Sequence, residues 1–237
     1  MHRFDAQARL STSAGKLHRQ VMRNALLLLG NPDPRSFNAE LARSYAQGFT
    51  AAGGSATTID LGQLNFDLVL RRGFREPQPL EPDLEKVRIA IEKADHVVWL
   101  FPTYWGSPPA LVRGLVDRVF LPNWAFRYNG GALPEGLLRG RSARVIATMD
   151  SPAWWYALAH RWALHATMGT GTLRFSGFSP VRFSLVHGVR EMEAAARNKQ
   201  IERIRAVAGK DARSSRPRGA PQALPANQKP RELVAHE

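Results

Sequence analysis

Five strand-like segments alternate with helix-like segments along this chain, and the alternation limits the possible folds more than any other feature. Strands are predicted at residues 24–30, 55–61, 96–101, 142–149 and 180–189, the first of them a short apolar run that should be fully buried. Apolar residues at helical spacing predict helices at 36–54, 81–94, 109–120, 154–168 and 190–208. Strands that alternate with helices form βαβ units with right-handed crossovers and a parallel sheet covered on both faces. We therefore expect an α/β fold, a doubly wound three-layer sandwich around a five-stranded parallel sheet.

The two ends of the chain do not follow this pattern. Residues 1–23 hold five Lys or Arg and one acid, and residues 209–237 hold six Lys or Arg and three acids, so the ends carry more than half of the net charge of +13. The first segment resembles an organelle transit peptide or an over-long start before Met22, and the last is rich in Pro, Ala and Arg. We predict a disordered N-terminal extension at 1–23, a folded domain at 24–208 and a disordered basic tail at 209–237.

Composition and motif content exclude several kinds of function. None of the 237 residues is cysteine, which removes disulfides, Cys-ligated metals and thiol catalysis. The sequence also lacks H-E-x-x-H and G-x-S-x-G, so no metal site and no serine hydrolase is predicted. It contains no basic face interleaved with aromatic residues and no apolar run near the length of a membrane span. We expect a cytoplasmic protein that binds no nucleic acid, does not insert into membranes and needs a bound cofactor for any redox chemistry.

Three loops at one edge of the predicted sheet are the candidates for a binding site. Open parallel sheets bind ligands at the carboxyl ends of their strands, where the strand order reverses. The loops there are "GNPDPRSFN" (30–38), "PTYWGSPP" (102–109) and "TMDSPAWWY" (148–156). The first joins hydrogen-bonding side chains to a helix start, which is typical of a phosphate site, although Ser36 could also be a plain N-cap. It has neither G-x-G-x-x-G nor a Walker lysine, so Rossmann-type dinucleotide or NTP binding is not indicated.

The second loop has the residues that a flat heteroaromatic ligand requires. Pro102 ends the strand, and Gly106 permits a turn that a Cβ would block. Tyr104 and Trp105 offer aromatic planes beside backbone N–H and C=O groups. The same residues could instead close the end of the sheet as a hydrophobic wedge. In the third loop the strand stops at Asp150, where the start of a helix is an equally simple interpretation.

Three segments carry a resemblance to a known family. The stretches "NPDPRSFN", "FPTYWGSPPALVRGLVDRVF" and "WAFRY" resemble the NAD(P)H:quinone oxidoreductase family of flavodoxin-like flavoproteins, which includes the modulator-of-drug-activity quinone reductases and the ancillary reductases of potassium-efflux systems. The resemblance spans about residues 24–208 and includes the insertion "GQLNFDLVLRRGFREPQPLEP" after the second strand. It implies a flavodoxin-like fold, a bound flavin, NAD(P)H as co-substrate, a quinone-like acceptor and a homodimer.

The same resemblance assigns roles to residues of this chain. Those matching the cofactor site come from the three loops: Asn31, Ser36, Phe37 and Asn38 at the phosphate; Pro102, Thr103, Tyr104, Trp105 and Gly106 under the isoalloxazine; and Thr148, Met149, Asp150 and Ser151 at its pyrimidine side. Aromatic residues over the substrate pocket, which a second subunit completes in the family, are Phe126, Tyr128 and Phe175. The candidate catalytic residues are Tyr156 and His160, with His165 as the other possible histidine.

One departure from the family pattern concerns charge. Family members often have Thr-Thr-Gly-Gly where this chain has Thr148 to Ser151, so that an Asp replaces a Gly. A carboxylate near N1 of the flavin would disfavour negative charge on the reduced ring. We therefore expect Asp150 to point away from that end of the ring or to be neutralised.

The function expected from the resemblance is two-electron hydride transfer from NAD(P)H, through the flavin, to quinones or similar acceptors. FAD is favoured over FMN because the first loop lacks the hydroxyl-rich, Gly-containing cradle of true flavodoxins. Two alternatives stay open at this point. One is a regulatory ancillary subunit of a potassium-efflux transporter, and the other is a flavodoxin-like electron carrier.

Overall fold

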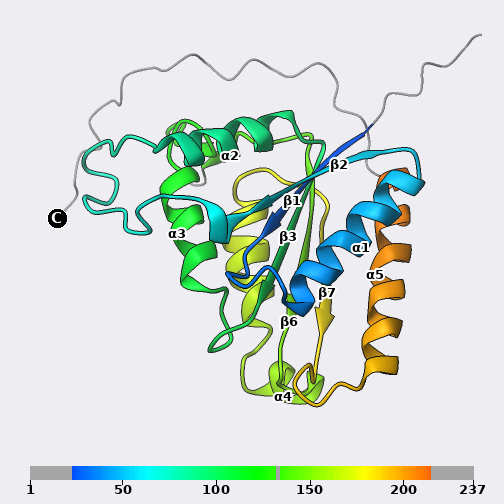
Figure 1. Cartoon of the computed structure of the whole chain (residues 1–237). Helices are drawn as coiled ribbons and strands as arrows, with labels where there is room; N and C mark the ends of the chain where they lie inside the picture. Colours follow the sequence, from blue (N-terminus) through cyan, green and yellow to red (C-terminus); the bar gives the residue numbers. More distant parts are fainter. Residues whose placement is uncertain (1–22, 132–133, 215–237) are drawn as a thin grey trace, which may run out of the picture.

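A five-stranded parallel sheet forms the centre of the protein, in a computed structural model that describes residues 23–131 and 134–214 (Figure 1). The strand order is β2-β1-β3-β6-β7, with parallel pairing throughout, and it reverses between β1 and β3. The bounds are Asn24–Leu29 for β1, Ser55–Asp60 for β2, His96–Pro102 for β3, Ser142–Thr148 for β6 and Val181–Val186 for β7. The expected doubly wound, five-stranded α/β fold is confirmed.

Helices cover both faces of the sheet. Helices α1 (Phe37–Ala51) and α5 (Ala194–Ser214) lie on one face, and α2 (Pro82–Lys93), α3 (Ala110–Val119) and the π-helical segment η2 (His165–Arg174) lie on the other (Figure 1). Successive strand residues point to opposite faces, so Leu26 and Leu28 belong to one core and Leu27 and Leu29 to the other. Within the described ranges, no helix has the length and apolar character needed to cross a bilayer.

Smaller elements complete the chain. A 3₁₀ turn, η1 (Leu61–Gln63), follows β2, and a short antiparallel pair joins β4 (Phe126–Arg127) to β5 (Glu135–Gly136). Helix α4 (Ala153–Leu158) follows β6 at the carboxyl edge of the sheet (Figure 1).

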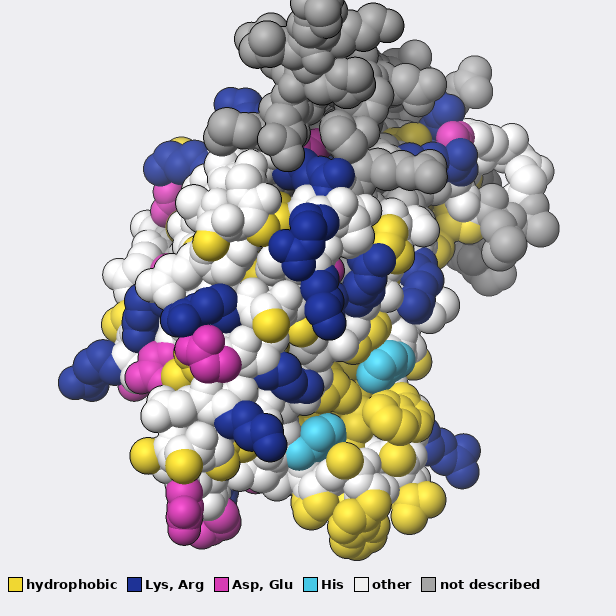
Figure 2. Space-filling view, turned by 90° about the vertical axis from the view of Figure 1, so that its right-hand side faces the viewer, with side chains coloured by type: hydrophobic (Ala, Val, Ile, Leu, Met, Phe, Trp, Pro, Cys, Tyr) yellow, Lys and Arg dark blue, Asp and Glu magenta, His cyan; other side chains and the backbone are white. Residues whose placement is uncertain are grey.

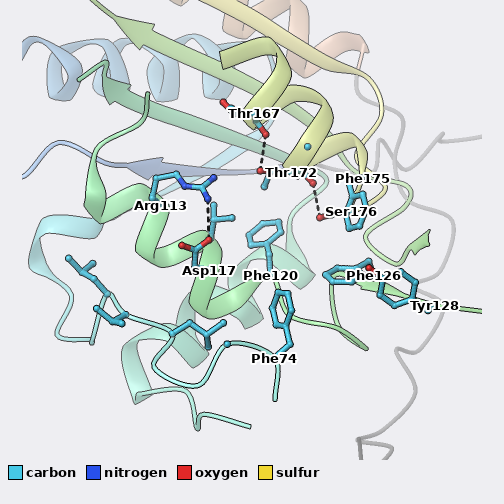
Figure 3. Close-up of a pocket in the computed structure, with 16 residues that line it drawn as sticks. Phe74, Arg113, Asp117, Phe120, Phe126, Tyr128, Thr167, Thr172, Phe175 and Ser176 are labelled. Atoms are coloured by element: carbon cyan, nitrogen blue, oxygen red, sulfur yellow. Dashed lines mark hydrogen bonds and ion pairs between the residues drawn. The ribbon is translucent and has the colours of Figure 1, made fainter. Parts of the chain in front are cut away.

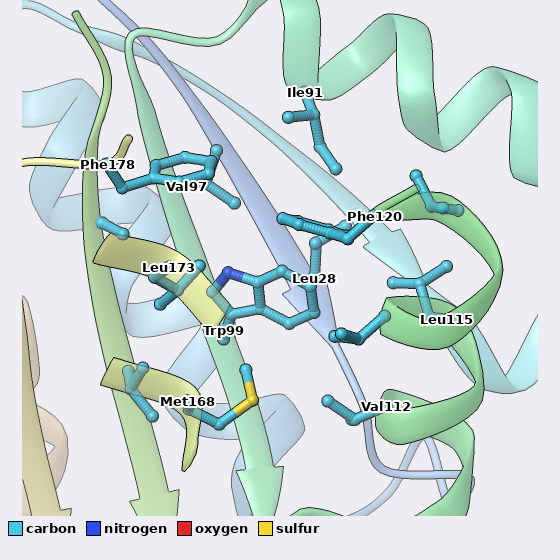
Figure 4. Close-up of a cluster of buried hydrophobic side chains, with 14 of the residues drawn as sticks. Leu28, Ile91, Val97, Trp99, Val112, Leu115, Phe120, Met168, Leu173 and Phe178 are labelled. Atoms are coloured by element: carbon cyan, nitrogen blue, oxygen red, sulfur yellow. The ribbon is translucent and has the colours of Figure 1, made fainter. Parts of the chain in front are cut away.

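The larger of the two cores is built around Trp99 of β3. Its indole is fully buried and meets the ring of Phe120 at a centroid distance of 5.9 Å. Figure 4 shows side chains from β1, α2, α3 and η2 closing around it. Truncating a buried aromatic of this size costs about 3–5 kcal/mol, so Trp99 fixes α3 and η2 against the sheet.

The predicted helix at 154–168 is wrong, because the segment is broken in the middle. Helix α4 ends at Leu158, and Arg161 and Trp162 then have positive φ angles of 45° and 55°. Two consecutive left-handed residues stop an α-helix, and the chain resumes as η2 in the wider π geometry. Hydrophobic periodicity at 3.6 residues per turn does not register either event.

The last helix extends past the predicted domain boundary at residue 208. Helix α5 begins at Ala194 rather than at residue 190 and continues to Ser214, and Asp211 and Ala212 within its last turns are buried. The basic tail predicted from residue 209 therefore starts inside a packed helix. The expectations of disorder for residues 1–22 and 215–237 lie outside the described residues.

A buried ion pair holds the end of α5 to the sheet. The Arg144 guanidinium donates to both carboxylate oxygens of Asp211, with 2.8 Å between Nη2 and Oδ1, and the Tyr45 hydroxyl donates to Oδ2 at 2.7 Å. His96 joins the network through Tyr45 at 2.9 Å and through Ser142 at 2.8 Å. Burial alone would raise the pKa of Asp211, but the hydrogen bonds from Arg144 and the contact with His96 bring the pKa well below its usual value.

We predict that Asp211→Asn lowers the free energy of unfolding at pH 7 by about 3 kcal/mol, because Arg144 stays buried without its charge partner. Since the pKa of Asp211 is lower in the folded than in the unfolded chain, the wild type should lose this stabilisation as the pH falls below about 4. Chemical denaturation at several pH values measures both effects.

Glu202→Gln is the matched control on the same helix. Glu202 forms an exposed pair with Arg205, whose loss should cost less than about 1 kcal/mol. Equal losses for the two variants would contradict the assigned role of Asp211.

Candidate functional site

The three predicted loops meet at the carboxyl edge of the sheet. The backbone N–H of Thr103 donates to the carbonyl of Thr148 at 2.7 Å, which joins the second loop to the third. The Asn38 side-chain amide donates to the Thr148 hydroxyl at 2.9 Å, which joins the first loop to the third. The three loops that carry the predicted cofactor-binding residues therefore form one continuous rim, beside the place where the strand order reverses.

The first loop is a helix start organised by its own side chains. Asn31 Oδ1 accepts from the N–H of Asp33 at 3.0 Å, and Asp33 Oδ1 accepts from the N–H of Arg35 at 2.9 Å. Ser36 caps α1, with its hydroxyl accepting from the N–H of Ala39 at 3.3 Å. The N-cap and the anion site are compatible, because the first turn of a 15-residue helix leaves further N–H groups without intrahelical partners.

Phe37 has a different position from its neighbours in this loop. Its ring is buried in the smaller core, and the Arg197 guanidinium lies 5.1 Å above it. Phe37 therefore anchors the start of α1 and presents its backbone, rather than its side chain, to the rim.

The second loop is a tight turn with an exposed tryptophan at its tip. Tyr104 and Ser107 exchange two backbone hydrogen bonds of 2.9 Å, and the two residues between them have positive φ angles, 52° at Trp105 and 71° at Gly106. A left-handed tryptophan is uncommon, and this one is completely exposed. Such strain gathers at ligand-binding positions, so the turn favours a ligand over a wedge packed into the sheet.

The two candidate catalytic residues lie next to this turn. A Cβ at Gly106 would overlap Nδ1 of His160, so the imidazole sits directly against the turn. The ring of Tyr156 stacks on His160 at 5.9 Å and is itself buried. Its hydroxyl oxygen accepts from the N–H of Leu164 at 3.0 Å, and burial raises the pKa of the phenol.

His165, the other histidine considered, lies elsewhere. Its ring stacks on Phe183 of β7 at 3.9 Å. Burial, and then the charge of Arg174, lower the pKa of its imidazole. Of the two histidines, His160 is the one in contact with the Trp105–Gly106 turn.

Residues after β7 hold the third loop in place, and sequence reasoning missed them. The His187 ring donates from Nδ1 to the carbonyl of Ser151 at 2.9 Å. Asp150 accepts from the backbone N–H of Arg190 at 2.9 Å, and its second oxygen lies 3.3 Å from Arg190 Nη2. Met149 is bound through its backbone, with its N–H donating to Val186. The one sequence signal that could have found His187 and Arg190 is their position, because "VHGVR" (186–190) comes at the end of a predicted parallel strand, at the same edge of the sheet.

Two buried polar atoms at the rim have no partner among the described residues. They are the side-chain oxygen of Asn38 and the hydroxyl of Thr103. An unsatisfied buried polar group costs about 1–3 kcal/mol. Unsatisfied polar atoms close to the Trp105–Gly106 turn favour a planar ligand with hydrogen-bonding atoms on its edge.

The predicted substrate-side aromatics come together around a cavity of about 890 Å³ (Figure 3). The ring of Phe126 lies 4.9 Å from Phe175 and 5.8 Å from Tyr128 between centroids. Phe74 and the Arg113–Asp117 ion pair contribute to other walls. None of the predicted cofactor-binding residues lines this cavity, so one chain holds the two sets of residues in separate places.

The carboxyl edge also exposes apolar surface near α4. Figure 2 shows apolar side chains gathered at the lower end of the molecule, beside histidines. The exposed large residues of this region are Tyr104, Trp105, Trp154, Trp155, Leu158 and Trp162. Within the described ranges, no group of three His, Cys, Asp or Glu side chains is arranged to hold a metal ion.

Comparison with known proteins places the chain in a family. A family model described as a flavodoxin-like fold matches residues 23–208. NAD(P)H dehydrogenase (quinone) 1 of Cavia porcellus is 24% identical over 196 residues, which cover 71% of this chain and 70% of the relative.

Two solved structures have the same arrangement. Smu.1420 of Streptococcus mutans superposes with a TM-score of 0.69 at 26% identity, over 79% of this chain and 99% of the other. An FMN-dependent NADH-azoreductase of Bacillus anthracis, solved in complex with FMN, gives a TM-score of 0.62 at 15% identity, over 81% of this chain and all of the other, and is a likeness of fold alone.

We predict that Gly106→Ala destabilises the protein by more than the 1–2 kcal/mol or so that a left-handed alanine costs, because its Cβ also displaces His160. Gly130→Ala is the control: its φ is +80°, but a Cβ there meets nothing within 4 Å. Chemical denaturation compares the two. Adding His160→Ala should recover part of the lost free energy of unfolding in Gly106→Ala, but none in Gly130→Ala. Recovery in neither variant, or in both, would contradict the contact between Gly106 and His160.

Proposed function

We propose that this chain, which belongs to the flavodoxin-like fold family, is a flavin-dependent NAD(P)H dehydrogenase (quinone). The observation that carries it is the rim itself: unsatisfied oxygens of Asn38 and Thr103 beside a left-handed, exposed Trp105. The quinone-reductase name of the Cavia porcellus relative supports the same activity.

The residues at the rim fit a flavin. The amino terminus of α1 would hold its phosphate, and the Trp105–Gly106 turn would lie under the ring. Asn38 Oδ1 can only accept a hydrogen bond, whereas the Thr103 hydroxyl can donate or accept, which suits a ring edge bearing both N–H and C=O groups. A bound flavin supplies two-electron transfer between NAD(P)H and a quinone, and the protein supplies position and charge stabilisation.

Tyr156 and His160 lie beside the Trp105–Gly106 turn on which the flavin ring would rest. Because burial raises the pKa of Tyr156, its phenol stays protonated at neutral pH and keeps an O–H group for donation. We assign Tyr156 the role of stabilising negative charge on the reduced flavin, at the end of the site next to the Trp105–Gly106 turn. His160 positions the turn through its contact with Gly106.

A homodimer would bring the two separated sets of residues together. Trp105 at the tip of the rim is fully exposed, and the aromatic cluster of Phe126, Tyr128 and Phe175 lines a cavity elsewhere on the same chain. In a dimer with twofold symmetry, the cluster of one copy can cover the rim of the other, which gives two equal sites. The exposed large apolar side chains in both regions are consistent with such an interface.

We propose FAD as the flavin because of the composition of the first loop. FMN is the alternative, because a protein of the same fold was solved in complex with FMN. The cytoplasmic location stays a prediction.

The direct test is to purify the protein, record its visible absorption and identify the released flavin by mass. We predict a yellow protein that oxidises NAD(P)H when a quinone is present. Thr103→Val should weaken flavin binding about tenfold, the equivalent of one lost hydrogen bond. Thr58→Val on the exposed part of β2 is the control and should bind flavin as the wild type does. A protein that takes up neither FAD nor FMN would end the proposal.

Subunit complementation tests the shared site. One tagged chain carries Thr103→Lys at the rim, and a second carries Phe126→Ala and Phe175→Ala in the aromatic cluster. Each homodimer should be nearly inactive, whereas the purified heterodimer has one intact site and should recover about half of the wild-type activity. A heterodimer no more active than either parent would show that each site lies within one chain.

A further inference from the structure

The loop after β6 carries a negative charge on Asp150, and the groups that contact this carboxylate are clear in the structure. Asp150 lies two residues after Thr148, the last residue of β6, whose carbonyl accepts the hydrogen bond from the N–H of Thr103. Both of its carboxylate oxygens are engaged by the same residue: Oδ1 by the backbone N–H of Arg190 at 2.9 Å and Oδ2 by the guanidinium at 3.3 Å. Asp150 is thus turned toward the segment after β7.

The two contacts have separate effects. The backbone N–H of Arg190 fixes the direction of the carboxylate, and any residue at position 190 other than proline would supply it. The guanidinium adds a positive charge beside the carboxylate, and only a basic residue can do so. Substitutions at residue 190 can therefore remove the neutralising charge while the backbone N–H still fixes the position of the Asp150 carboxylate.

We propose that Arg190 is a positioning residue that neutralises Asp150 beside the redox cofactor and so raises the reduction potential of that cofactor. The inference rests on the proposed function, because it requires a flavin at the rim. A negative charge next to a ring that gains electrons disfavours the reduced form, and a paired cation cancels most of that field.

The ion pair is exposed, with side-chain exposures of 77% for Arg190 and 54% for Asp150. Salt should therefore screen the pair, and the effect of Arg190 should shrink as ionic strength rises. A pair that only anchored the loop would change flavin affinity without moving the potential in opposite directions for its two members.

The test is a double-mutant cycle on the flavin-loaded protein, with Arg190→Gln, Asp150→Asn and the combined variant. All three keep the backbone N–H of residue 190 and a side-chain oxygen at residue 150, so the loop retains its hydrogen bond. Spectroelectrochemical titration gives the midpoint potential, and flavin release gives the occupancy. Arg205→Gln, which removes an arginine from an exposed pair on α5, is the control.

We expect Arg190→Gln to lower the midpoint potential, Asp150→Asn to raise it, the combined variant to lie nearer the wild type than Arg190→Gln does, and Arg205→Gln to leave it unchanged. An unchanged potential in Arg190→Gln, or a combined variant as low as Arg190→Gln alone, would overturn the inference while leaving the proposed function intact. A wild-type protein that binds no flavin would overturn both.

Discussion

The pairing of β3 with β6 is the interaction on which the rest of the site depends. The two strands run in register from His96 opposite Ser142 to Pro102 opposite Thr148, and both are almost wholly buried. The ladder continues one step beyond the strands, from the N–H of Thr103 to Thr148. A slip of one residue would turn every side chain of β3 to the other face and separate the two loops.

Most of the fold could be predicted from the sequence because its information is local. Strands β1, β3 and β6 are short runs rich in apolar residues, and for the whole main sheet the predicted and observed strand ends differ by only a few residues. The failures have non-local causes. Nothing near Asp211 in the sequence indicates a buried helix end, because its partner Arg144 is 67 residues away. The left-handed pair Arg161 and Trp162 likewise leaves no trace in periodicity.

The candidate site divides in the same way. The loops at 30–38, 102–106 and 148–151 follow apolar strands, so their meeting at one edge could be inferred from topology. The support for those loops could not. His187 and Arg190 act through a loop that is about 40 residues earlier in the chain, and the contact between His160 and Gly106 depends on the break after α4. The unsatisfied oxygens of Asn38 and Thr103 likewise became visible only in three dimensions.

The buried ion pair between Arg144 and Asp211 has a practical consequence for attaching the protein to a surface. It fixes the carboxyl-terminal end of α5 beside the first residues of β3 and β6, at the opposite end of the sheet from the Trp105 turn (Figure 1). A tether attached at Ser214 would therefore orient the molecule on an electrode or bead with its rim facing the bulk solution. The same attachment near α4 would press the rim against the support.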